Sequence, residues 1–156
     1  MDSKESQMHI VELLINNEVN VGKLYRAYAE QFPDYCNFWA GLASEEAEHA
    51  SWIRKLALKV AEGAVLVNDR RFNASAIKTF SGYLERELIK ANKSGISLIS
   101  ALSTALYIEE SIIEQKYFEL FDGDSVEFKK TLIDLANATK DHRSRVKEAL
   151  NKARSV

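Results

Sequence analysis

Proline and glycine are scarce in this chain of 156 residues, which has one proline and six glycines. These two residue types interrupt helices, whereas the abundant Ala, Leu, Glu and Lys favour them. The scarcity therefore predicts an all-α fold with long helices and few breaks. The length suits one domain over residues 1–156, with a single hydrophobic core.

Cysteine, net charge and long apolar runs are also lacking. Cys36 stands alone, which excludes a disulfide within this sequence and the paired Cys-x-x-Cys motifs of a rubredoxin-type iron centre or zinc ribbon. The 21 basic and 23 acidic residues create no overall field that attracts nucleic acid or an anionic membrane. The polar start MDSKESQ does not resemble a signal peptide, and no apolar run approaches the roughly 20 residues that span a bilayer. We expect a cytoplasmic protein with neither nucleic acid nor membrane as partner.

Apolar residues at alternating spacings of three and four predict four long helices, over residues of about 5–32, 35–62, 97–121 and 125–153. Pro33 ends the first helix and Gly63 ends the second. The stretch between the second and third long helices reads as a crossover containing a shorter helix over residues 74–92. Short turns make the first two helices, and likewise the last two, antiparallel. Two hairpins joined by a long crossover form the antiparallel four-helix bundle of ferritin-like proteins.

Polar residues interrupt the apolar stripe of each long helix near its middle. They are Glu18, then Glu46 with His49, then Glu110, then His142. Burying a charge costs about several kcal/mol unless it is paired or ligated. Four such interruptions on four helices therefore predict a shared polar site in the core.

The residue types in this set favour a metal site. Glu46 and His49 are three residues apart and so point from the same face of one helix. Carboxylate and imidazole together suit iron or manganese, and a metal pair held by carboxylates suits oxygen or peroxide chemistry. Taken singly, a stripe Glu is commonly solvated and an inward His is commonly a hydrogen-bonded core residue. The hypothesis therefore rests on the whole set.

Thr139 stands where a second Glu-x-x-His would place a carboxylate, three residues before His142. The separation of Glu18 from Glu46 nearly equals that of Glu110 from Thr139, so Thr139 is the equivalent of Glu46. A neutral hydroxyl is a poor substitute for a carboxylate ligand. Three outcomes follow: a single metal on Glu46, His49 and Glu18, an asymmetric pair completed by water, or an empty site held by hydrogen bonds.

Three segments carry a resemblance to a known family. SEEAEHASWI, at residues 44–53, resembles the LA-x-EE-x-x-H segment of the rubrerythrin and ferritin-like families. ALYIEESIIEQKYF, at residues 105–118, is similar to their third helix, and LIDLANATKDH, at residues 132–142, to their fourth. The resemblance spans residues of about 11–146 and is specific in order and spacing, though loose in residue identity.

The resemblance implies a set of metal ligands: Glu18, Glu46, His49, Glu110 and His142, with Thr139 where the family has Glu. It implies an iron cofactor of one or two ions, with manganese, zinc or no metal as alternatives, and redox activity on oxygen or peroxide. Tyr25 corresponds to a tyrosine often found beside the metal pair, although a plain core aromatic is an equal alternative.

Two departures from the family bear on activity. Ile113 replaces an extra carboxylate of peroxidase-type rubrerythrins, and the rubredoxin-like tail is missing, so catalysis would need an external electron donor. The main alternative is a degenerate ferritin-like protein without catalysis, a dimeric structural or interaction module, and Thr139 supports it. A third hypothesis is a helical module that recognises another protein.

The first hairpin has more large aromatic side chains than one stripe can use, which predicts a homodimer face. They are Tyr25, Tyr28, Phe32, Tyr35, Phe38, Trp39 and Trp52. Charged residues beside the stripes are expected to be solvated or to form interhelix ion pairs. These are Glu45, Glu48, Glu109, Asp141, Arg143 and Arg145.

Overall fold

The computed structural model describes residues 3–67, 74–93, 95–111, 121–122 and 126–155. These residues are mostly helical, as the all-α prediction requires. The elements in chain order are α1 (Ser3–Gln31), the 3-10 turn η1 (Pro33–Tyr35), α2 (Cys36–Ala61), β1 (Leu66–Val67), α3 (Ala74–Ala91), α4 (Leu98–Ser111), β2 (Phe121–Asp122) and α6 (Val126–Arg154). No helix in this part of the chain has the length and apolar content to cross a membrane.

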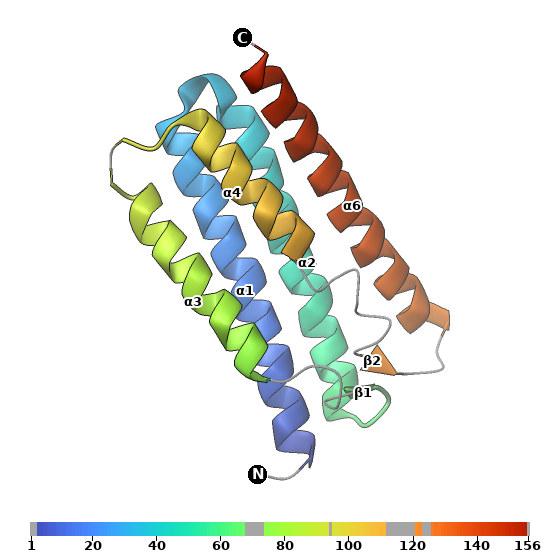
Figure 1. The fold of residues 1–156 in the computed structure, drawn as a ribbon. Coiled ribbons are helices and arrows are strands. Elements are labelled where there is room, and N and C mark those ends of the chain that lie inside the picture. Colours follow the sequence, from blue (N-terminus) through green and yellow to red (C-terminus); the bar gives the residue numbers. More distant parts are fainter. Residues whose placement is uncertain (1–2, 68–73, 94, 112–120, 123–125, 156) are drawn as a thin grey trace.

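The long helices lie side by side, as Figure 1 shows. The α1 and α2 helices form one hairpin through the short η1 turn, and α3 packs against α1. The α6 helix packs against α4 and, over a smaller contact, against α2. Residues from α1, α2, α4 and α6 can therefore meet in one interior.

The helix ends near the first hairpin agree with the sequence. Pro33 follows the end of α1 and opens the η1 turn. The α2 helix ends at Ala61, and Gly63 adopts the left-handed conformation with φ of 80°. Its N–H donates to the Val60 carbonyl, and that of Ala64 donates to the Lys59 carbonyl, which caps the last turn. Gly63 is therefore the helix stop that was predicted.

The third predicted long helix, over residues 97–121, agrees with the structure as far as Ser111 and is contradicted at Phe121. The α4 helix ends at Ser111 in the described residues, and residues 112–120 lie outside them. Phe121, where the helix was expected to end, belongs instead to β2. This strand pairs antiparallel with β1, with Leu66 opposite Asp122 and Val67 opposite Phe121. A two-residue strand has too few positions to produce an alternating pattern, so the sequence could not reveal it.

Two hydrophobic clusters fill the interior. The first contains Leu24, Tyr25, Trp39, Leu42, Leu102, Val146 and their neighbours. The second contains Val11, Leu14, Ile53, Leu56, Phe128, Leu132 and others. Along α1, α2 and α6, a short interval separates the members of one cluster from those of the other. Buried polar residues occupy that interval, among them Glu18 on α1, Glu46 on α2 and His142 on α6.

Candidate metal site

A layer of buried polar side chains lies between the two hydrophobic clusters. Glu46 is fully buried, and Glu18, His49, Thr139 and His142 each expose 4% or less of their surface. These are the residues that interrupt the apolar stripes of α1, α2 and α6. Apolar packing on both sides keeps solvent away, so charges within the layer must be compensated by one another or by a bound ion.

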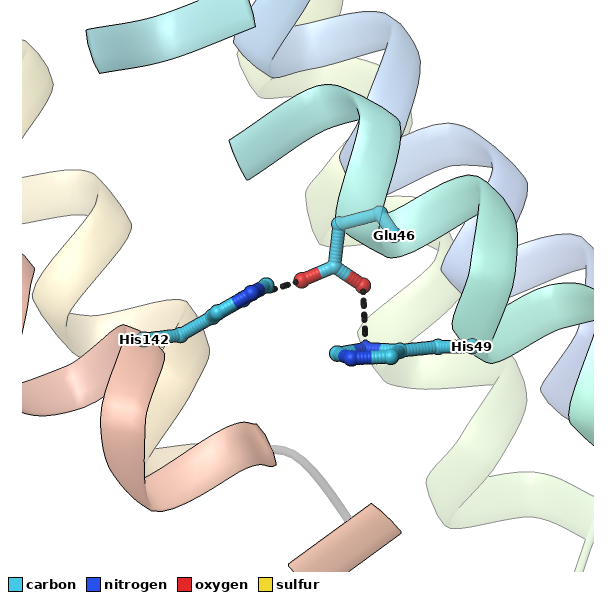
Figure 2. Close-up of side chains that lie close together, drawn as sticks. All are labelled: Glu46, His49 and His142. Atoms are coloured by element: carbon cyan, nitrogen blue, oxygen red, sulfur yellow. Dashed lines mark hydrogen bonds and ion pairs between the residues drawn. The ribbon is translucent and has the colours of Figure 1, made fainter. Parts of the chain in front are cut away.

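Glu46 lies between the two histidines (Figure 2). Its Oε1 is 3.0 Å from His142 Nδ1, and its Oε2 is 3.3 Å from His49 Nδ1. Glu46 and His49 are on successive turns of α2, whereas His142 comes from α6. One ligand atom from each of the three residues lies within 4.8 Å of the other two. That spacing allows the three to bind one ion.

Two further carboxylates complete the layer. Glu18 of α1 places Oε2 3.8 Å from His49 Nδ1. Glu109 of α4, which is fully buried, places Oε1 3.5 Å from His142 Nδ1. Each imidazole therefore lies near Glu46 and at least one further carboxylate, and α1, α2, α4 and α6 all contribute to the layer.

The prediction that Glu110 faces the interior is wrong, because Glu110 is exposed and its neighbour Glu109 is buried. The predicted stripe of α4 followed large side chains such as Ile99, which is 42% exposed. The interior face instead contains Ala101 and Ala105, which precede Glu109 by eight and four residues. An error of one residue turns a helix by about 100°. The alanine spacing was the signal that would have identified Glu109.

Thr139 occupies the position predicted for it, buried on α6 one turn before His142. Its hydroxyl donates to the Leu135 carbonyl at 3.0 Å, within its own helix. The missing carboxylate is thus replaced by a hydroxyl group that already donates its hydrogen to the Leu135 carbonyl. No charge is added to the layer at this place.

Tyr25 contacts the polar layer through its hydroxyl, which donates to Glu109 Oε1 at 2.6 Å. Burial, together with the negative charges of Glu109 and Glu46, raises the pKa of Tyr25 well above its usual value. The phenol therefore stays neutral and serves as a donor to Glu109. The sequence pointed to Tyr25 as a residue near the site, but it did not predict the hydrogen bond to Glu109.

The layer stabilises positive charge on both histidines. Burial opposes that charge, but hydrogen bonds and attraction from Glu18 and Glu46 raise the pKa of His49 to about 11. Burial likewise opposes a charge on His142, while Glu109 and Glu46 raise its pKa to about 10. Burial also opposes ionisation of Glu46, yet hydrogen bonds with Glu18, His142 and His49 leave its pKa lowered. In the absence of a metal ion, the two imidazolium ions offset part of the negative charge of Glu18, Glu46 and Glu109.

The donor set fits a metal ion. Four buried atoms of the layer make no hydrogen bond of regular geometry within the described residues: Glu46 Oε2, His49 Nδ1, Glu109 Oε2 and His142 Nε2. Three of them have ion-pair contacts only, since Glu46 Oε2 and His49 Nδ1 face each other at 3.3 Å and His142 Nε2 lies 3.6 Å from Glu45. Buried polar atoms without a hydrogen bond are rare and call for an explanation such as an ion. Two histidines and one carboxylate form the ligand set of non-haem Fe(II) sites, and the same set also suits zinc.

A charged network extends from His142 to the surface. Glu45 Oε2 lies 3.6 Å from His142 Nε2, and Arg145 Nη2 lies 2.9 and 2.8 Å from the two oxygens of Glu45. Arg145 also pairs with Asp141 at 2.9 Å. The expected interhelix ion pairs thus include one between α2 and α6, next to the site.

Three of the aromatic residues that were assigned to a dimer face lie instead in the core of the single chain. Tyr25, Tyr28 and Trp39 are at most 1% exposed. They form part of the first hydrophobic cluster, so the core of a single chain buries more of these aromatic rings than the apolar stripes predicted. A homodimer stays a prediction without the support of these three rings.

Comparisons with known proteins identified no relative of this chain. No family model, no curated protein and no solved structure matches the chain.

Proposed function

We propose that this chain is a ferritin-like, rubrerythrin-related protein that binds a metal ion, iron before others, through Glu46, His49 and His142. One observation carries the proposal: ligand atoms of these three buried residues lie within 4.8 Å of one another. The three-ligand set favours a single ion. Of the three outcomes left open by Thr139, the proposal is closest to the first, a single metal, but with His142 in place of Glu18 as the third ligand.

The relation to the ferritin-like fold is supported by position. The residues of the layer come from the middles of α1, α2 and α6 and from the end of α4, and the helix α3 lies in the crossover between the two hairpins. The Glu-x-x-His pair is on the second long helix, and the remaining His is on the last. That order is the one on which the sequence resemblance rests.

The proposed activity is redox chemistry on oxygen or peroxide. Glu46, His49 and His142 would hold the ion, and iron bound by such a set would supply redox chemistry towards these oxidants. The residues of the chain would orient the ligands and keep water from the site. Glu46 aligns both imidazoles, and the two hydrophobic clusters exclude bulk water. Glu18 and Glu109 supply negative charge beside the ligands. Reducing equivalents would come from an external donor.

Metal binding is tested by anaerobic titration of the purified protein with ferrous iron. We expect one iron per chain, and an ultraviolet absorption change when air is admitted. His49→Gln and His142→Gln should each abolish binding, whereas His9→Gln, which changes the remaining histidine of the chain, should not. No iron above background in the wild type would refute the proposal. Two irons with an oxo-bridge band would replace it with a di-iron site.

A second candidate is a ferritin-like protein that no longer binds metal. Its support is that the layer is compensated without an ion, since Glu46 contacts two charged imidazoles and Thr139 is satisfied within its helix. This candidate predicts a folded protein whose melting temperature does not respond to iron, manganese or zinc. The titration above distinguishes the two candidates directly.

A further inference from the structure

A series of oxidisable aromatic side chains begins at the polar layer. Tyr25, bonded to Glu109, has its ring centroid 5.5 Å from that of Trp39. Trp39 in turn lies 4.8 Å from Tyr28. Such centroid separations place aromatic rings in direct contact. All three rings are buried, so the series runs through the first hydrophobic cluster without touching solvent.

The series continues to the surface through α3 and α4. Tyr28 and Tyr83 both form a hydrogen bond with Thr104, which links their phenols through one hydroxyl. Tyr83 then meets Tyr107 edge to face, with centroids 5.0 Å apart. Tyr107 is 53% exposed. Oxidisable groups thus connect the layer to one exposed ring.

We propose that Tyr25, Trp39, Tyr28, Tyr83 and Tyr107 form an electron relay, and that an external one-electron donor delivers at the α3–α4 surface around Tyr107. The inference rests on the proposed redox function for its oxidant, which is of the peroxide class. It also gives the external donor a definite place of contact.

Each end of the relay has the chemistry that its step requires. When Tyr25 loses one electron towards the oxidant, its phenolic proton moves to Glu109 Oε1, 2.6 Å away. An electron from Trp39 and the return of that proton restore Tyr25. Two such passages supply the two electrons that, with two protons from solvent, reduce one peroxide to two waters. The donor at Tyr107 is oxidised by one electron in each passage.

Trp39 is suited to pass an electron rather than hold a radical. Its indole N–H is buried and has no hydrogen-bond partner within the described residues. An oxidised Trp39 therefore has no base to take its proton, and it returns to the starting state when Tyr28 reduces it. The Glu87 carboxylate acts on both Tyr28 and Tyr83. Its negative charge stabilises the transient positive charge that electron loss leaves on each phenol, until the next residue of the series reduces it.

The chain offers a means of testing the relay without metal. Cys36 is exposed, is the one cysteine in the sequence and lies one helical turn before Trp39. A ruthenium polypyridyl complex attached there, oxidised by a light flash with a quencher, removes one electron from the protein. A spin trap followed by peptide mass mapping then locates the radical.

In the wild type we expect the trapped radical on Tyr107. Tyr83→Phe keeps the ring but removes its oxidisable phenol, so the Tyr107 adduct should be lost and the transient radical upstream should persist longer. Tyr35→Phe, a matched change near the label but outside the series, should behave like the wild type. Equal Tyr107 adducts in the wild type and in a folded Tyr83→Phe variant would overturn the relay.

An iron-loaded arm separates this inference from the proposed function. Hydrogen peroxide added to the loaded protein should give the same Tyr107 adduct, and should not do so in Tyr83→Phe. If the chain binds iron but Tyr107 is never trapped, the relay is wrong and the metal site stands. If it binds no iron, the proposed function fails, and the ruthenium experiment still decides whether the relay conducts.

Discussion

His49 and His142 stack against each other, with ring centroids 4.9 Å apart and an angle of 30° between the planes. The rings come from α2 and α6, so this contact joins two helices that are distant in sequence. Two imidazolium ions at this distance repel each other, and Glu46 offsets the repulsion because it contacts both. The state of charge of this pair controls stability and metal binding alike.

The first prediction concerns pH in the metal-free protein. The folded pKa values of about 10 for His142 and about 11 for His49 lie above the ordinary value of 6.5. Their contribution to stability is therefore complete below pH 6.5 and is lost as the pH rises through 10 and 11. The free energy of unfolding, from urea denaturation with a chelator present, should fall across this window. In His142→Asn it should fall less steeply, and equal slopes would contradict a charged His142.

Metal binding should release protons. A ligating imidazole must be neutral, so an ion has to displace the protons that His49 and His142 hold in the free protein. The apparent affinity for Zn²⁺ or Fe²⁺ should therefore increase from neutral pH towards pH 10. Calorimetric titration in buffers of different ionisation enthalpy measures the number of protons released. A binding enthalpy that does not depend on the buffer would count against this exchange.

Glu109 and Glu110 provide a matched pair of variants. Glu109→Ala leaves the buried hydroxyl of Tyr25 without its acceptor, which should destabilise the fold by about 1–3 kcal/mol. Glu110→Ala changes an exposed side chain and should alter stability by less than about 0.5 kcal/mol. Chemical denaturation measures both, and the isosteric Glu109→Gln tests the charge alone. Equal effects at the two positions would mean that the orientation of α4 is wrong.

Thr139→Glu restores the second Glu-x-x-His. In the metal-free protein the added carboxylate is buried beside other carboxylates, so the melting temperature should drop. Iron should raise it again, and the metal content should increase above that of the wild type. Thr139→Val, which keeps the volume but loses the bond to Leu135, is the control and should gain nothing from iron. A Thr139→Glu variant with unchanged metal content would show that the layer has no room for a second ion.

The sequence predicted the helices well because their apolar spacing is regular. The expected ranges 5–32, 35–62 and 74–92 differ from α1, α2 and α3 by only a few residues at their ends. The position of Glu46, His49 and His142 in the interior also followed from spacing, since each continues a long apolar stripe. Local periodicity determines which face of such a helix is buried.

The same reasoning failed where large side chains are exposed. On α4, Ile99 and Tyr107 are partly in solvent while two alanines face the core, so a stripe drawn through bulky residues selected Glu110 instead of Glu109. The Tyr25–Glu109 hydrogen bond joins residues 84 positions apart. Such a contact depends on how helices pack against one another, and periodicity within one helix carries no information about it.

The separation of Glu46 and His142 by 96 positions has a consequence for biosynthesis. A chain made from its amino end completes α1 and α2, with Glu18, Glu46 and His49, long before the residues of α6 exist. Until His142 docks, the carboxylates of this first hairpin have only one imidazole beside them. Glu46, His49 and His142 therefore come together only after α6 has been made and has docked, and metal capture would report that docking.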